Sequence, residues 1–147
     1  MELITKQVDG KPLTITIEYS ELDMKIKKVI QRIKSLDLMI SANSDGKTFS
    51  LNVSEIYYIE TVGRKVFLYT EDEIYMVDKK LYELEKQLED TGIIRISKFC
   101  LMNMDMLYSV KQLMNSQLEA TLINGEKLIV ARTYLKCIKD ILKEEVR

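Results

Sequence analysis

The chain has 147 residues, 46% of them hydrophobic, with one proline and five glycines, which suits one compact domain with its own core. It has no histidine, which is the commonest general base and the commonest metal ligand, and it has no P-loop or GxGxxG motif for binding nucleotides. We therefore expect no enzyme activity, metal or cofactor. The net charge of −1 does not by itself suggest a nucleic-acid partner.

The N-terminal part predicts a β-hairpin over residues 2–19 and an amphipathic helix over residues 20–36. Asp9-Gly10 is a two-residue turn signal, and apolar residues alternate with polar ones after it. Ser20 is the expected N-cap, with Asp23 at the third helical position of a capping box. An apolar stripe at helical spacing follows, made of Leu22, Ile26, Val29, Ile30, Ile33 and Leu36.

From residue 38 the apolar period changes to two, which predicts short strands separated by turns. The expected strands cover residues 38–42, 48–53, 56–60, 66–69 and 74–77. A short helix over residues 78–90 follows, with Asp78 as its cap and Gly92 as its terminator.

The last third of the chain predicts more strands and a final helix. Asn124-Gly125 is a strong hairpin signal between two of these strands. The expected order is a strand at 93–97, an irregular apolar stretch at 99–106, strands at 107–111, 118–123 and 127–130, and a helix at 133–145. The fold class is therefore α+β and β-rich, with mainly antiparallel strands. We expect an extension over residues 1–37 and a β-rich module over residues 38–147.

Charge is segregated along the chain although its total is small. Residues 71–92 hold eight acidic and three basic side chains, a net of −5, whereas residues 93–139 hold seven basic and three acidic ones, a net of +4. This distribution could form one basic face, or it could be an ordinary solvated surface with an acidic helix. Basic residues at the ends of strands can present cations to phosphates and guanine edges.

Neither membrane insertion nor secretion is expected. No apolar run approaches the roughly 18 residues of a membrane span, and the N-terminus lacks a basic segment followed by an apolar core. Cys100 and Cys137 show no CxxC spacing, so we expect two free, buried thiols in a reducing compartment. These features predict a cytoplasmic protein.

A series of short motifs runs through the module in a fixed order. The motifs are I-x-Y-I-E at Ile56–Glu60, R-K-V-F-L-Y at Arg64–Tyr69, L-x-E-L-E-x-x-L at Leu81–Leu88, I-R-I-S-K at Ile94–Lys98, Asn103, N-G-E-K-L at Asn124–Leu128 and A-R-x-Y-L at Ala131–Leu135. Each motif alone is weak, but their joint order over about 100 residues is specific. Together they resemble the LytTR family of DNA-binding domains.

The resemblance implies a bacterial transcription regulator that binds double-stranded DNA through loops of a β-rich domain. Many relatives begin with a receiver domain, for which the residues before the module are too few, so the chain looks like the stand-alone type. The DNA-facing residues implied are Arg64, Lys65, Ser97, Lys98, Arg132 and Thr133. Phosphate contacts by lysines and arginines are expected to position the domain, and one or two arginines are expected to read base edges.

Several of these residues also have a structural interpretation. Arg95 alternates with apolar neighbours on a strand, so a pairing inside the sheet is as plausible as a phosphate contact. Thr133 could be a helix cap. Asn103 is interpreted as a structural residue that fixes a loop. The chain departs from the family with Phe99 and Ala131 where Ser is common, and with Ser97 where His is often found.

The chain is also expected to form a homodimer, at least on DNA. One small module covers few base pairs, so specificity favours two copies on repeated half-sites. The extension over residues 1–37 is the expected dimerisation or docking element, with packing against its own module as the alternative. The rival function, from a different class, is a non-enzymatic protein–protein adaptor whose basic patch meets an acidic partner.

Overall fold

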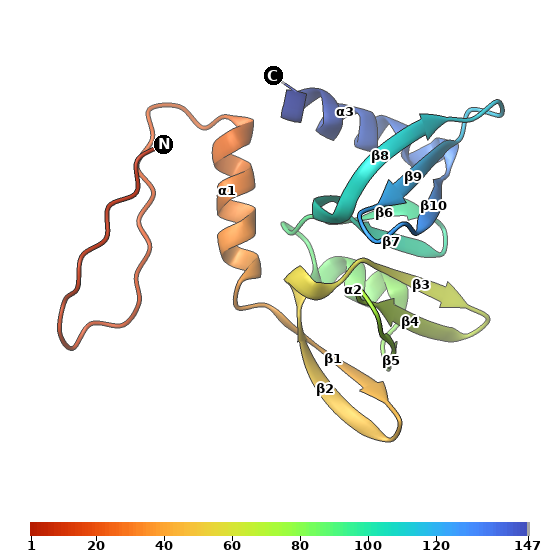
Figure 1. Ribbon diagram of the computed structural model, residues 1–147, viewed down its shortest axis with the longest axis horizontal. Coiled ribbons are helices and arrows are strands. Elements are labelled where there is room, and N and C mark those ends of the chain that lie inside the picture. Colours follow the sequence, from red (N-terminus) through yellow and green to blue (C-terminus); the bar gives the residue numbers. More distant parts are fainter. Residues whose placement is uncertain (147) are drawn as a thin grey trace.

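A computed structural model describes residues 1–146, and the side chains of residues 1–143. Two antiparallel sheets form the β-rich module (Figure 1). The larger sheet has the order β2-β1-β5-β4-β3-β7-β6, and the smaller has the order β10-β9-β8. The predicted fold class, α+β with mainly antiparallel strands, is confirmed.

The larger sheet is assembled almost entirely from short hairpins and neighbouring strands. Its strands are β1 (Met39–Ser44), β2 (Lys47–Asn52), β3 (Tyr58–Val62), β4 (Lys65–Tyr69), β5 (Ile74–Val77), β6 (Ile93–Ser97) and β7 (Cys100–Asn103). The alternation of buried and exposed residues in β1 and β4 follows the period of two in the sequence. The predicted irregular stretch at 99–106 is wrong in its first half, because β7 forms there with all four residues buried. Its unbroken apolar run hid a strand that is covered on both faces.

The smaller sheet consists of β8 (Leu107–Gln112), β9 (Leu118–Leu122) and β10 (Lys127–Val130). The short helix α2 (Leu81–Gln87) contributes Leu81, Leu84 and Leu88 to the core on one side of the larger sheet. The other side of that sheet packs against the smaller sheet and against the helix α3 (Leu135–Val146). Helix α2 begins later than expected, with Lys80 rather than Asp78 at its N-cap.

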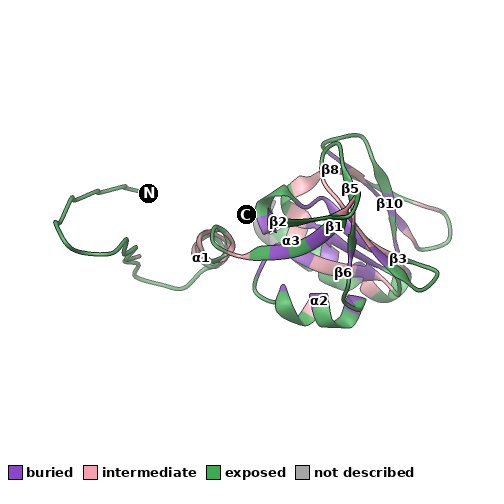
Figure 2. Ribbon diagram, turned by 90° about the horizontal axis from the view of Figure 1, so that it is seen from below, coloured by how far each residue is buried: buried purple, intermediate pink, exposed green. Residues whose placement is uncertain are grey.

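The N-terminal extension differs from the predicted hairpin and helix. The turn at Asp9-Gly10 is present, with a hydrogen bond from the Lys11 amide to the Val8 carbonyl, but residues 1–23 form no strand. Figure 2 shows this segment leading away from the module with nearly all of its residues exposed. A two-stranded hairpin without a surface to cover is only marginally stable, which accounts for the difference.

Helix α1 (Met24–Ser35) starts three residues later than expected, because Asp23 rather than Ser20 is its N-cap. The Asp23 carboxylate accepts a hydrogen bond from the Ile26 amide at 3.0 Å. No residue of α1 is fully buried. The helix touches the module through an ion pair between Arg32 and Asp105 at 3.6 Å. Its C-terminal end is tied down by a hydrogen bond from the Asn52 side chain to the Leu36 carbonyl at 2.6 Å.

The two cysteines differ in environment, so the prediction of two buried thiols is wrong for one of them. Cys100 is buried and Cys137 is exposed on α3. Burial, together with the nearby Glu60 carboxylate, raises the pKa of the Cys100 thiol to about 12. Cys100 therefore stays protonated and unreactive at neutral pH. Among residues 1–146, no helix is long and apolar enough to cross a membrane.

Asn103 joins β7 to the segment before β3. Its side-chain amide donates to the Ile56 carbonyl at 2.7 Å, and its side-chain oxygen accepts from the Asp105 amide at 3.0 Å. The residue is 3% exposed, so neither bond can be replaced easily by water. The structural interpretation of Asn103 is confirmed.

We expect Asn103→Ala to lower the free energy of unfolding by about 2–3 kcal/mol, because a buried carbonyl loses its donor and a turn loses its cap. Urea unfolding followed by circular dichroism measures the change. Asn115→Ala, at an exposed loop position, is the control and should cost less than about 0.5 kcal/mol. An equal loss in the two variants would show that the buried amide contributes nothing specific.

Candidate nucleic-acid interface

The turn between β3 and β4 presents two of the predicted site residues. Gly63 and Arg64 form a two-residue turn, because Val62 pairs with Lys65 across the hairpin. Gly63 has φ 65°, whereas Arg64 is not in the left-handed region. That combination is typical of a type II′ turn, in which glycine takes the first central position. The turn leaves Arg64 and Lys65 exposed.

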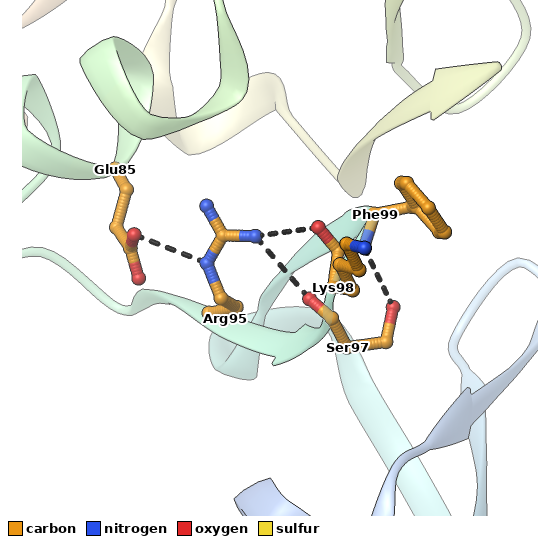
Figure 3. A network of polar contacts seen from close by, with 5 residues as sticks. All are labelled: Glu85, Arg95, Ser97, Lys98 and Phe99. Atoms are coloured by element: carbon orange, nitrogen blue, oxygen red, sulfur yellow. Dashed lines mark hydrogen bonds and ion pairs between the residues drawn. The ribbon is translucent and has the colours of Figure 1, made fainter. Parts of the chain in front are cut away.

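The turn between β6 and β7 presents Ser97 and Lys98, and the guanidinium of Arg95 fixes its shape (Figure 3). Arg95 Nη1 donates to the Lys98 carbonyl at 2.7 Å and lies 3.4 Å from the Ser97 carbonyl. Arg95 Nε donates to Glu85 Oε1 of α2 at 3.0 Å. We call these contacts of Arg95 with Glu85, Ser97 and Lys98 the Arg95 clamp. Of the two interpretations of Arg95, the structure supports the pairing inside the protein.

The third loop follows β10. Ala131 is the N-cap of a single 3-10 turn over Arg132–Tyr134, which leads directly into α3. Arg132 and Thr133 are both exposed. Thr133 lies inside this turn, and the N-cap position makes no side-chain hydrogen bond, so Thr133 is not a helix cap. Thr133 is therefore an exposed residue that directly follows Arg132 in this turn.

Two backbone hydrogen bonds bring the three loops to the same end of the module. The Thr61 amide at the end of β3 donates to the Phe99 carbonyl at 2.8 Å, which ties the Arg64 turn to the Lys98 turn. The Ala131 amide donates to the Ile96 carbonyl, also at 2.8 Å, which places Arg132 beside the end of β6. The β3–β4 and β6–β7 turns lie on the right of Figure 1. All six predicted site residues thus lie on three adjoining loops.

The electrostatics of this end favour an anionic ligand. Within the described part of the chain, none of Arg64, Lys65, Lys98 and Arg132 forms an ion pair with a carboxylate. The amine of Lys98 lies 5.5 Å from the centroid of the Phe99 ring. The nearby Glu60 carboxylate accepts a hydrogen bond from the Tyr69 hydroxyl at 2.7 Å. Burial, and then this bond, raise the pKa of Tyr69, so its hydroxyl remains a donor.

Sequence reasoning missed how these loops are joined. The two connecting bonds use backbone groups of Thr61, Phe99, Ala131 and Ile96, for which side-chain patterns give no signal. The partner of Arg95 was also hidden, since Glu85 lies on a different element. No group of three or more Cys, Asp or Glu side chains within the described residues is placed to hold a metal ion.

A β-rich module with unpaired cations on three adjoining loops has the surface expected of a nucleic-acid-binding domain. A family model described as the LytTr DNA-binding domain matches residues 46–143, which is well over half of the chain. The chain belongs to the LytTR family of DNA-binding domains. That family is defined by DNA binding rather than by catalysis.

Individual relatives agree with this assignment. The chain is 25% identical over 154 aligned positions to the sensory transduction protein LytT of Bacillus anthracis, covering 97% of this chain and 61% of that protein. It is 27% identical to an HTH-type transcriptional regulator of Staphylococcus aureus, covering 87% of this chain and 88% of that protein. The chain thus spans about three fifths of the LytT protein and most of the S. aureus regulator.

The fold also matches a solved structure, the LytTr DNA-binding domain of a putative methyl-accepting/DNA response regulator from Bacillus cereus. The TM-score is 0.67 at 18% identity, with 71% of this chain and 95% of the other covered. At this level of identity the match concerns the fold. It shows that the two-sheet arrangement described above is that of a LytTr domain.

We expect Arg95→Ala to lower the free energy of unfolding by about 1–3 kcal/mol, because two carbonyls and a carboxylate lose a charged donor. Glu85→Ala should cost less than about 1 kcal/mol, since the Glu85 side chain is 43% exposed and its ion pair is screened by water. Denaturant unfolding of both variants gives the comparison. A larger loss for Glu85→Ala would contradict the view that the turn carbonyls are the main partners of Arg95.

Proposed function

We propose that this protein is a transcription regulator that binds double-stranded DNA sequence-specifically through the three adjoining loops. The observation that supports this most is the convergence of Arg64, Lys65, Lys98 and Arg132 at one end of a LytTR-family module, all exposed and without carboxylate partners in the described chain. Cations in such an arrangement release condensed counterions when they approach the phosphates of a duplex. The overall charge of −1 does not prevent DNA binding, because salt screens distant charges and the potential near the loops is set by the basic residues there.

The loops divide the work between anchoring and reading. Lys98, Arg64 and Lys65 lie on tight turns whose backbone is fixed by hydrogen bonds, which suits contacts with phosphates. Arg132 is carried by a 3-10 turn at the start of α3, where a planar fork of donors can reach guanine O6 and N7. Ser97 Oγ accepts the Phe99 amide at 3.3 Å, which leaves its hydroxyl hydrogen free for a phosphate oxygen.

The proposal predicts that the purified chain binds duplexes selected from a random or genomic library, with an affinity that falls as salt rises. Electrophoretic mobility shift or fluorescence anisotropy over a salt series measures the slope of log affinity against log salt, to which each phosphate contact contributes close to one unit. If no duplex is retained at low salt, while an acidic protein surface is bound, the chain is an adaptor and the proposal is wrong.

Two single variants examine the division of work in the same assay. Arg132→Ala should cost about 1–3 kcal/mol on the selected duplex and much less on random duplexes. Lys98→Ala should weaken all sequences about equally and lower the salt slope by about one unit. Lys127→Ala is a suitable control, because Lys127 is exposed but lies 3.9 Å from the Glu119 carboxylate on the neighbouring strand. Uniform losses in both variants would refute the assignment of base reading to Arg132.

We further propose that the chain acts as a homodimer, held together by residues 1–37. This part leaves much apolar surface in water: Leu3 is 85% exposed, Leu13 is 90% exposed and Leu22 is 53% exposed. The apolar stripe of helix α1 is only partly covered by the module, since no residue of the helix is fully buried. A hollow of about 260 Å³ lies beside the helix and is lined by Arg32, Leu36 and other residues. A second copy would cover this surface through self-complementary two-fold pairing. It would also place two modules on one duplex, about 34–36 Å apart.

We expect Leu13→Asp combined with Ile15→Asp to convert a dimer into a monomer, because both side chains are exposed in the single chain and would be desolvated only between copies. Light scattering at tens of micromolar, with and without duplex, gives the mass. Thr14→Asp combined with Thr16→Asp adds the same charge to the alternate positions and should leave the mass unchanged. A wild-type chain that is monomeric in both conditions would disprove the dimer.

A further inference from the structure

The β6–β7 turn is fixed from both sides before any ligand arrives. On one side the Arg95 clamp bonds the carbonyls of Ser97 and Lys98, as Figure 3 shows. On the other side the Phe99 carbonyl accepts the Thr61 amide at 2.8 Å, while the Phe99 amide bonds Ser97 Oγ. The position of the Phe99 backbone is therefore set by the fold and does not depend on how its side chain packs.

The side chain of Phe99 is not part of either core. It is 55% exposed, whereas the next residue, Cys100, is 8% exposed. In Figure 3 the ring points away from Arg95 and Glu85. A single exposed aromatic residue needs no explanation by itself, but this one lies among the basic loops. Its place, rather than its exposure, indicates a role.

Phe99 lies among basic residues. The amine of Lys98 is 5.5 Å from the centroid of the Phe99 ring, and the Phe99 carbonyl is bonded to Thr61, next to the turn that carries Arg64 and Lys65. This end of the module thus presents an exposed apolar ring, with cations on the same turn and on the adjoining one. This combination matches one feature of a major groove in particular. The 5-methyl group of thymine is the only apolar group on the base edges there, and phosphates flank the groove on both sides.

We infer that Phe99 is a specificity-determining residue that recognises thymine by contact with its 5-methyl group in the major groove. This inference rests on the proposed function, since it needs the three loops to face DNA. Phe offers no hydrogen-bonding group to a base or phosphate, only an apolar ring. The site preferred by this chain therefore contains a thymine beside the bases or phosphates that Lys98 contacts. The Arg95 clamp has a positioning role, because it fixes the turn that carries the ring.

The experiment uses the full chain and a duplex selected from a random library. Each thymine of that duplex is replaced in turn by deoxyuridine, which lacks only the methyl group, and binding is measured by fluorescence anisotropy at one salt concentration. For the wild type, we expect one or two replacements to weaken binding about three- to fivefold, the effect of losing one buried methyl group. The remaining replacements should have no effect.

Protein variants then connect this methyl group to Phe99. Phe99→Ala should bind the unmodified duplex about 5- to 20-fold more weakly and should no longer distinguish thymine from deoxyuridine at the sensitive positions. Phe99→Leu, which keeps an apolar side chain, should retain part of the discrimination. Tyr108→Ala is the matched control, because Tyr108 is an exposed aromatic residue at the start of β8, and it should behave as the wild type.

The possible outcomes separate this inference from the proposed function. If selected duplexes bind but no deoxyuridine replacement matters, or if Phe99→Ala keeps the discrimination, the thymine contact is wrong and DNA binding stands. A uniform loss in Phe99→Ala across all modified duplexes would indicate sugar contact or insertion between bases, and would also overturn the inference. If no duplex binds the wild type, the proposed function fails and this inference fails with it. Unfolding midpoints of the variants exclude loss of fold as the cause.

Discussion

The end of strand β6 is the point on which the candidate interface depends. The pairing of β6 with β7 is irregular between Arg95 and Ser97, and Ile96 has no partner residue in that register. Its carbonyl is therefore free for the amide of Ala131, which lies beyond the end of the other sheet. Irregularities of this kind bend a strand and redirect its groups, and they often occur beside functional sites. Here one such irregularity joins the two sheets and sets the third basic loop beside the second.

Charge in this chain is arranged by pairing as well as by position. Helix α2 lies in the acidic part of the sequence, and its Glu85 neutralises Arg95, which holds the β6–β7 turn together. Arg64, Lys65, Lys98 and Arg132 keep no such partner among the described residues. A count of basic residues would rank Arg95 with these four, although its side chain is only 16% exposed and already bonded. The distinction matters for mutagenesis, since removing Arg95 changes the shape of the site and not only its charge.

The sequence predicted most of the module because its strands are short, half-buried and bounded by turn residues, so their period of two is visible. The sequence-based prediction was wrong where the burial of an element does not follow the apolar pattern of its residues. Strand β7 is buried on both faces and lost its alternation, and Cys137, in an apolar context, faces solvent on α3. The expected hairpin before α1 failed for the opposite reason, since its alternating residues have no surface to cover in a single chain. The loops that carry Arg64, Lys98 and Arg132 were identified through family motifs, but their convergence comes from backbone bonds that no pattern reveals.

The rigid β6–β7 turn also has a consequence for kinetics. A loop that must order itself on binding adds an entropic cost and slows productive encounters. The backbone around Lys98 is already bonded through Arg95 and Thr61, so this loop arrives at its partner in its final shape. For a regulator of the proposed kind, association would then be governed by electrostatic steering and would be similar for most sequences. Preferred and random duplexes would then differ mainly in the dissociation rate of the complex, so specificity would arise from a longer residence time on the preferred duplex.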